Sequence, residues 1–296
     1  MPAMHTTQFF GRDGLRLAAD VVGNPQNPPA ILLHGGGQTR FSWGDTANAL
    51  ASNGFYVVSL DLRGHGGSGW SPDGVYDIDH YVDDLRLVCA TLGRPAALIG
   101  ASLGGLTSLL AVGEGDAPIA TALVLVDVAP RINPSGSENI VRFMRSAPDG
   151  FSSLDEAAEA ISAYLPHRPR PTDLSGLRRN LRLGDDGRLR WHWDPMTLAG
   201  NVTSLADAYV RLSSAARKIR IPVLLVRGEK SDVVTDESVR DFQELVPKAE
   251  YTVISGAYHM VAGDRNTGFG AAVIDFMRRR CGGGTMPLSE RPGKPG

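Results

Sequence analysis

Short apolar runs alternate with amphipathic segments along the first part of the chain. The runs have the composition of strands buried on both faces of a parallel sheet, and they cover residues 30–33, 55–60, 96–99 and 122–126. The segments between them space their apolar residues as helices do, and they cover residues 43–52, 77–92 and 103–112. Residues 6–10 and 15–22 are predicted to form an opening hairpin. This order predicts an α/β fold with a mostly parallel, doubly wound sheet.

The pattern changes after residue 130. Weakly periodic helical segments separated by proline-rich joints cover residues 138–145, 154–164, 173–181 and 202–216. We interpret residues 131–218 as a helical cap inserted into a core made of residues 1–130 and 219–280. The core pattern then resumes, with strands predicted at 221–226 and 250–254 and helices at 235–246 and 269–279. Residues 281–296 are rich in glycine and proline, and we expect a disordered tail there.

Composition and charge narrow the possible functions. The chain has 296 residues, a formal net charge of −2 and two cysteines. Charge this close to balance gives no reason to expect nucleic acid or a membrane surface as a partner. Cys89 and Cys281 lack the spacing of metal ligands, and we expect free thiols. Because no apolar stretch is long enough to span a bilayer and the first residues do not resemble a signal peptide, we expect a cytoplasmic protein.

One pentapeptide points to nucleophilic chemistry. Residues 100–104, Gly-Ala-Ser-Leu-Gly, stand between a predicted strand and a predicted helix. G-x-S-x-G in that context forms a nucleophile elbow, a sharp turn that presents the serine hydroxyl above the edge of the sheet. Glycine is needed on both sides because a Cβ there would crowd the neighbouring strand or helix. Ser102 is therefore the candidate nucleophile.

A serine needs a base, and we predict that His259 fills this role. Histidine titrates near neutral pH, so it accepts the serine proton readily. His259 follows the last predicted strand, at the carboxyl end where ligand sites of parallel sheets lie. The other candidate histidines are assigned structural or cap positions, and they are His34, His65, His80, His167 and His192.

A third group must orient the imidazole and stabilise its charged form. Asp232 is the leading candidate, because it follows the penultimate predicted strand, next to the strand that precedes His259. Asp127, at the end of the strand after the nucleophile helix, is the alternative. Glu229 is a minor one.

The attacked carbonyl becomes an oxyanion, which needs amide donors aimed at it. We predict the amide of Leu103, directly after the nucleophile, as one donor. The second should come from the glycines after His34, most plausibly Gly36, with Gly37 as the next choice, because glycine lets the backbone approach a substrate closely.

Taken together, these motifs resemble those of the α/β-hydrolase (AB hydrolase) superfamily over about residues 9–280. The matching stretches are the loop 34–37, the turn 61–68, the elbow 100–104, residues 228–232 and residues 256–259. The resemblance implies the α/β-hydrolase fold, a triad of Ser102, Asp232 and His259, and no metal or organic cofactor.

The resemblance also implies the class of reaction. We expect a carboxylesterase-like serine hydrolase that cleaves a small carboxylic ester through an acyl-enzyme, with a small molecule as its only partner. The alternatives are a C–C bond hydrolase, a cofactor-free perhydrolase or haloperoxidase with the same triad, and a ligand receptor with little turnover. The sequence leaves the oligomeric state open.

Overall fold

The structure is a computed structural model that describes residues 3–166, 170, 172–199, 204–259, 261 and 267–282. His167 and the tail from residue 283 onward lie outside the described residues, so the expected disorder of the tail is not tested. No helix within these ranges combines the length and the apolar character needed to cross a bilayer.

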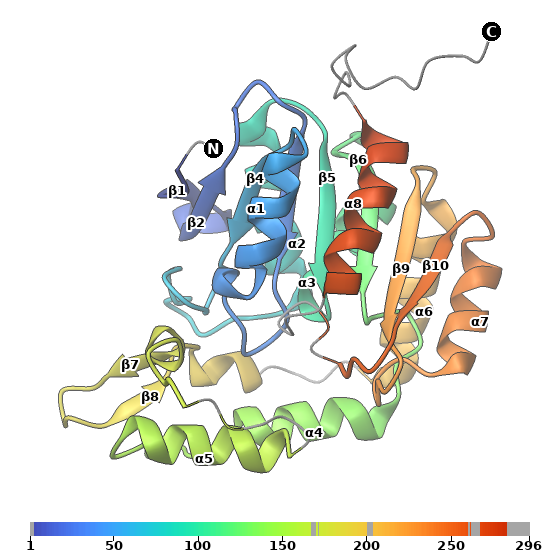
Figure 1. Cartoon of the computed structure of the whole chain (residues 1–296). Coiled ribbons are helices and arrows are strands. Elements are labelled where there is room, and N and C mark those ends of the chain that lie inside the picture. Colours follow the sequence, from blue (N-terminus) through green and yellow to red (C-terminus); the bar gives the residue numbers. More distant parts are fainter. Residues whose placement is uncertain are drawn as a thin grey trace, which may run out of the picture.

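A twisted sheet forms the centre of the molecule (Figure 1). Its eight strands have the order β1-β2-β4-β3-β5-β6-β9-β10. They are β1 (His5–Phe10), β2 (Arg16–Val22), β3 (Pro29–Leu33), β4 (Tyr56–Leu60), β5 (Ala96–Ala101), β6 (Ala120–Val126), β9 (Val223–Gly228) and β10 (Glu250–Ile254). The pairs β1–β2 and β2–β4 are antiparallel, and the remaining pairs are parallel. The predicted fold class and the opening hairpin are confirmed.

Helices cover both faces of the sheet because its strands are apolar on both sides. On β3, Ile31 and Leu33 pack into one core cluster, whereas Ala30 and Leu32 pack into the other. The first cluster lies under α2 (Ile78–Leu92), α3 (Leu103–Gly113), α6 (Leu205–Lys218) and α7 (Asp236–Leu245). The second lies under α1 (Gly44–Ser52) and α8 (Thr267–Cys281). The two layers hold the sheet rigid, so its strand ends are fixed supports for loops.

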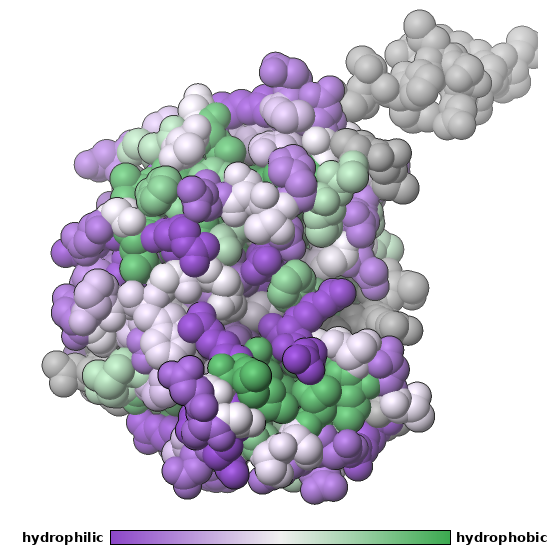
Figure 2. All heavy atoms as spheres, turned by 90° about the vertical axis from the view of Figure 1, so that its left-hand side faces the viewer, coloured by the Kyte–Doolittle hydropathy of each residue, from purple (hydrophilic) through white to green (hydrophobic). Residues whose placement is uncertain are grey.

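The elements between β6 and α6 lie beyond the carboxyl ends of the strands, below the sheet in Figure 1, and we call residues 133–199 the cap. They are α4 (Pro134–Met144), α5 (Leu154–Tyr164), η3 (Leu177–Asn180), β7 (Leu181–Leu183), β8 (Leu189–Trp191) and η4 (Pro195–Leu198). Aromatic side chains, including Phe151, Trp191 and Trp193, form its own small core. Figure 2 shows the side of the molecule on which β7 and β8 lie in Figure 1. In its lower part, where the cap is, a hydrophobic patch is bordered by hydrophilic residues.

Two details of the cap differ from the expectation. The helix predicted at 173–181 is replaced by η3 and the hairpin β7–β8, whose turn closes at Gly187 with a φ of 75°. The predicted segment 202–216 corresponds to α6, which packs against α3 so closely that a Cβ on Gly113 would lie 2.4 Å from the Ala215 carbonyl oxygen. Because α6 contributes Leu212 and Ala216 to the main core, it belongs to the α/β core rather than to the cap.

Candidate active site

Ser102 occupies a sharp turn between β5 and α3. Its backbone has φ 45° and ψ −114°, a strained conformation for a residue with a side chain. A Cβ on Gly100 would lie 2.4 Å from the Gly104 carbonyl oxygen, and a Cβ on Gly104 would lie 2.4 Å from the carbonyl oxygen of Leu33 on β3. The geometry is that of the predicted nucleophile elbow, and both glycines are needed for the reason expected from the sequence.

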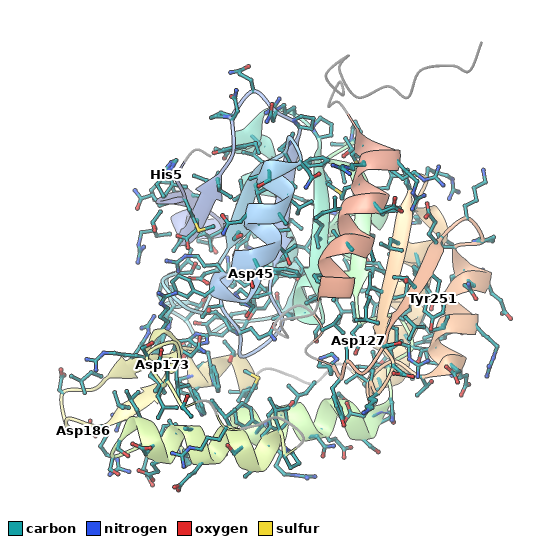
Figure 3. All side chains as sticks on the ribbon, in the orientation of Figure 1. His5, Asp45, Asp127, Asp173, Asp186 and Tyr251 are labelled. Carbon is teal, nitrogen blue, oxygen red and sulfur yellow. The ribbon has the colours of Figure 1, made fainter. Side chains whose placement is uncertain are left out.

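His259 comes from the loop after β10, and its carboxylate partner is Asp127. The Nδ1 of His259 lies 2.7 Å from Oδ2 of Asp127. Asp127 directly follows β6, near the lower end of the sheet in Figure 3. A histidine held through Nδ1 keeps Nε2 available as a base. The sequence analysis favoured Asp232 for this contact, and the structure brings the alternative, Asp127, to the histidine instead.

Asp127 is held in place by several donors. Its side chain is fully buried, and its backbone has a φ of 51°. The amide of Gly228 donates to Oδ1 at 2.9 Å, and the hydroxyl of Ser231 donates to Oδ2. These bonds compensate for the burial of the carboxylate and aim it at His259.

The loop after β9 explains why Asp232 is not the partner. The amide of Ser231 donates to the Gly228 carbonyl at 3.0 Å, and this turn directs Ser231 toward Asp127. Asp232 is exposed, and it meets Asn133 through its backbone carbonyl. Glu229, the minor candidate, accepts a hydrogen bond from the amide of Gly256. The strand order is as expected, with β9 between β6 and β10, so the conformation of the turn after β9 decides which carboxylate reaches His259.

The loop after β3 presents one amide to the site. The amide of Gly35 donates to Oε1 of Gln38 at 3.0 Å, and that of Gly37 donates to Nε2 of His65 at 3.2 Å. Within the described part of the chain, no acceptor takes the amide of Gly36 or that of Leu103. The amide of the second choice, Gly37, is already engaged, whereas the amides of Gly36 and Leu103, which the sequence predicts as donors, remain available.

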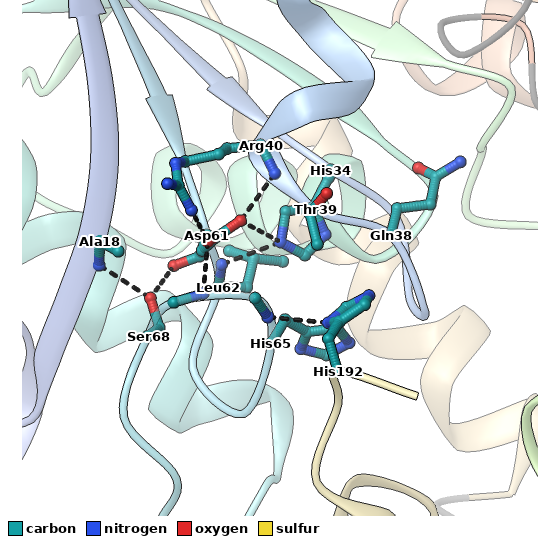
Figure 4. A network of polar contacts seen from close by, with 12 residues as sticks. Ala18, His34, Gln38, Thr39, Arg40, Asp61, Leu62, His65, Ser68 and His192 are labelled. Atoms are coloured by element: carbon teal, nitrogen blue, oxygen red, sulfur yellow. Dashed lines mark hydrogen bonds and ion pairs between the residues drawn. The ribbon is translucent and has the colours of Figure 1, made fainter. Parts of the chain in front are cut away.

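A column of three buried histidines supports this loop (Figure 4), and we call it the histidine column. The ring centroids of His34 and His65 are 5.1 Å apart, and those of His65 and His192 are 5.9 Å apart. Burial lowers the pKa of His34 to about 4 and that of His65 to about 3, and it lowers the pKa of His192 as well. All three are therefore neutral near pH 7.

Each neutral ring has a fixed tautomer, because each of its nitrogens faces a backbone group. In His34, Nδ1 donates to the Gly35 carbonyl and Nε2 accepts from the Leu62 amide. His192 belongs to the cap, where Nδ1 accepts from the Gly66 amide at 2.8 Å and Nε2 faces the carbonyl of Gly37 at 3.4 Å. The cap therefore contacts the same residue, Gly37, that His65 holds through its amide.

Two neighbouring cavities lie at His259, and one of them reaches Ser102. A small one of about 60 Å³, the chamber, is lined by Gly36, Ser102, Met144 and His259 among other residues. A wider one of about 620 Å³, the vestibule, opens beside it and carries Asp232. His259, Phe143 and Tyr164 line both. Within the described ranges, no group of three or more His, Cys, Asp or Glu side chains could hold a metal ion.

Comparison with known proteins gives a consistent result. Residues 27–266 match the family model described as serine aminopeptidase, S33. An esterase of Mycobacterium tuberculosis is 32% identical over 85% of this chain and 82% of its own length. A non-heme chloroperoxidase of Kitasatospora aureofaciens is 28% identical over 90% and 98%. The crystal structure of an E-2-(acetamidomethylene)succinate hydrolase has a TM-score of 0.81 at 22% identity, and the match covers 93% of this chain and 99% of that chain.

Proposed function

Because the chain belongs to the serine aminopeptidase S33 family of α/β hydrolases, we propose that it is a serine hydrolase that cleaves carboxylic esters through an acyl-enzyme on Ser102. One observation carries the proposal. Ser102 and His259 line the same chamber, and Nδ1 of His259 is 2.7 Å from the buried carboxylate of Asp127.

In the first half of the reaction, Ser102 attacks the ester carbonyl while Nε2 of His259 takes the hydroxyl proton. The carbonyl electrons move onto oxygen, where the amides of Gly36 and Leu103 stabilise the negative charge. Asp127 stabilises the imidazolium. When the carbonyl re-forms, the bond to the leaving oxygen breaks and His259 returns the proton to that oxygen, so an alcohol departs and the acyl group stays on Ser102.

In the second half, water takes the place of the alcohol. His259 removes a proton from the water as the water attacks the acyl carbon, and the same two amides bind the oxyanion. The bond to Ser102 Oγ then breaks, His259 protonates that oxygen, and a carboxylic acid leaves. No step requires a group beyond these residues and water.

A fluorophosphonate probe tests the proposal directly. We expect covalent labelling at Ser102, complete loss of labelling in Ser102→Ala, and strongly reduced labelling in His259→Ala. Purified protein should also hydrolyse p-nitrophenyl acetate and butyrate with turnover, which a ligand receptor would not do. A folded wild-type protein that stays unlabelled would contradict the proposal, and cleavage of ring-opened dienoate ketones in preference to esters would favour a C–C bond hydrolase.

A further inference from the structure

A third cavity lies between the cap and Trp70, and we call it the tryptophan pocket. It measures about 380 Å³ and is lined by Trp70, Trp191 and Trp193 together with Met144 and Leu198. The rings of Trp191 and Trp193 are stacked, with centroids 5.1 Å apart. A cavity of this size with three indole rings suits an apolar ligand.

Met144 separates the tryptophan pocket from the chamber. It is the last residue of α4, it is only 8% exposed, and it lines both cavities. Its side chain lies across the loop after β3, which carries Gly36 and Gly37 and is called the oxyanion loop below, since a Cβ on Gly37 would come within 3.2 Å of its Cγ and 3.3 Å of its Sδ. Methionine is unbranched and has three rotatable bonds, so this wall can turn aside without a change in the backbone.

The chemistry of the proposed reaction indicates which part of the ester each cavity would hold. His259 protonates the leaving oxygen, so the alcohol part of the ester must lie on the side of His259, where the vestibule opens. The acyl part then extends to the opposite side of Ser102. Met144 forms the wall of the chamber on which the tryptophan pocket borders.

We propose that the tryptophan pocket is an acyl-chain site and that Met144 sets the length of acyl chain that the enzyme accepts. This inference rests on the proposed function. With Met144 in place, the small chamber of about 60 Å³ takes a short acyl group. With Met144 turned aside, the chamber joins the tryptophan pocket, and a medium-length aliphatic chain packs against the indole rings.

The test is the chain-length profile of ester hydrolysis. We would measure kcat/KM for p-nitrophenyl esters from acetate to dodecanoate with wild-type enzyme and with Met144→Ala. The ratio of decanoate to acetate activity should rise at least about tenfold in Met144→Ala, because each methylene placed in an apolar site is worth about tenfold or more in kcat/KM. Met196→Ala, an exposed cap methionine outside both linings, should keep the wild-type profile.

Further variants distinguish two explanations for a changed profile: binding of the acyl chain in the tryptophan pocket, and a general loss of order in the cap. Leu198→Trp, added to Met144→Ala, fills the tryptophan pocket and should return the profile to that of wild type. Ile140→Ala enlarges the chamber without reaching the tryptophan pocket, and it should move the preferred chain by only one or two carbons.

Distinct results overturn the two proposals. A Met144→Ala enzyme that keeps Ser102-dependent acetate hydrolysis with an unchanged chain-length profile overturns the acyl-chain site and leaves the proposed function intact. Absence of labelling at Ser102 in the wild type overturns both. If Met144→Ala does not fold, Met144→Val removes less volume, and the same shift in smaller measure is expected from it.

Discussion

Four histidines of this chain lie in two regions that use the same side chain in opposite ways. In the histidine column, both nitrogens of each ring face backbone groups, and burial keeps the rings neutral. At the ends of β6 and β10, His259 has a buried carboxylate on Nδ1 and lines an open cavity. The comparison teaches that a buried carboxylate on one nitrogen, with space at the other, distinguishes a base from a structural histidine.

The two regions nevertheless serve the same reaction. Asp127 orients His259, the proton acceptor. The histidine column holds the N–H and C=O groups of Gly37, so the neighbouring Gly36 amide stays available to bind the oxyanion. Variants in the first region should affect the chemical step most, and variants in the second should affect stability and fine geometry.

The largest effect is expected from Asp127→Asn. An amide in place of the carboxylate favours the wrong tautomer of His259 and leaves its positive charge without a partner, so kcat/KM should fall by about 10³- to 10⁴-fold. Asp232→Asn is the matched control and should stay within about threefold of wild type. Ester hydrolysis with purified, folded variants measures both, and the reverse outcome would make Asp232 the functional acid.

Acid should destabilise the protein through the histidine column. His34 has a pKa of about 4 and His65 of about 3 in the folded state, against about 6.5 for an unfolded chain. Between these values the unfolded state binds more protons, so stability falls as pH drops from about 6.5 toward 4. For His34 alone the loss reaches about 3 kcal/mol at pH 4.

Urea denaturation across that pH range measures this loss. His65→Gln should reduce the slope of unfolding free energy against pH by up to about 1.4 kcal/mol per pH unit, because one proton fewer is taken up on unfolding. The charged groups near the column include Arg40 and Asp61, and they are unchanged in this variant. His5→Gln, on the exposed β1 strand, is the control. An equal slope in His65→Gln and wild type would contradict the prediction.

Ser231→Ala should have an intermediate effect. The Ser231 hydroxyl donates to Asp127 and accepts from the amides of Val233 and Val234, each at 3.1 Å. Its removal should lower kcat by about tenfold and stability by about 1–2 kcal/mol. Ser231→Thr keeps the hydroxyl and should retain most of both. Kinetics and thermal melting of the pair measure this, and equal losses in both variants would assign the effect to packing.

The smallest effect is expected at His192. Asn in its place offers an acceptor where Nδ1 meets the Gly66 amide, whereas Gln offers a donor where Nε2 faces the Gly37 carbonyl. If the contact to Gly37 tunes the oxyanion loop, His192→Asn should lower kcat a few-fold with KM unchanged, and His192→Gln should stay nearer to wild type. A change confined to KM would instead assign His192 to substrate binding.

Much of the core could be predicted from local sequence pattern. Strands buried on both faces are short apolar runs, and the elbow at Ser102 requires glycines whose spacing is visible in the sequence. His259 follows a predicted strand, and the structure brings it to the same chamber as Ser102. These features are determined by residues close together in the chain, so they can be predicted from a single sequence.

The partner of His259 could not be predicted in the same way. Strand β9 lies next to β10 as expected, so whether Asp127 or Asp232 faces the histidine depends on how the turn at Ser231 directs its side chains. The core position of α6 likewise depends on contact with α3, distant in sequence. Contacts between residues distant in sequence determine both the partner of His259 and the position of α6. The spacing of apolar residues along the chain does not show such contacts.

The contact between the start of α3 and the end of β3 bears on how such a protein can diversify. Gly104 touches the end of β3 directly, and its amide donates to the carbonyl of His34 at 3.2 Å. The nucleophile and the loop that carries Gly36 are therefore joined directly within the core, and the segment inserted between β6 and α6 meets that loop through the side chains of His192 and Met144. Mutation can rebuild that segment around new substrates while the reacting atoms keep their places, so selectivity and reactivity can evolve as separate modules.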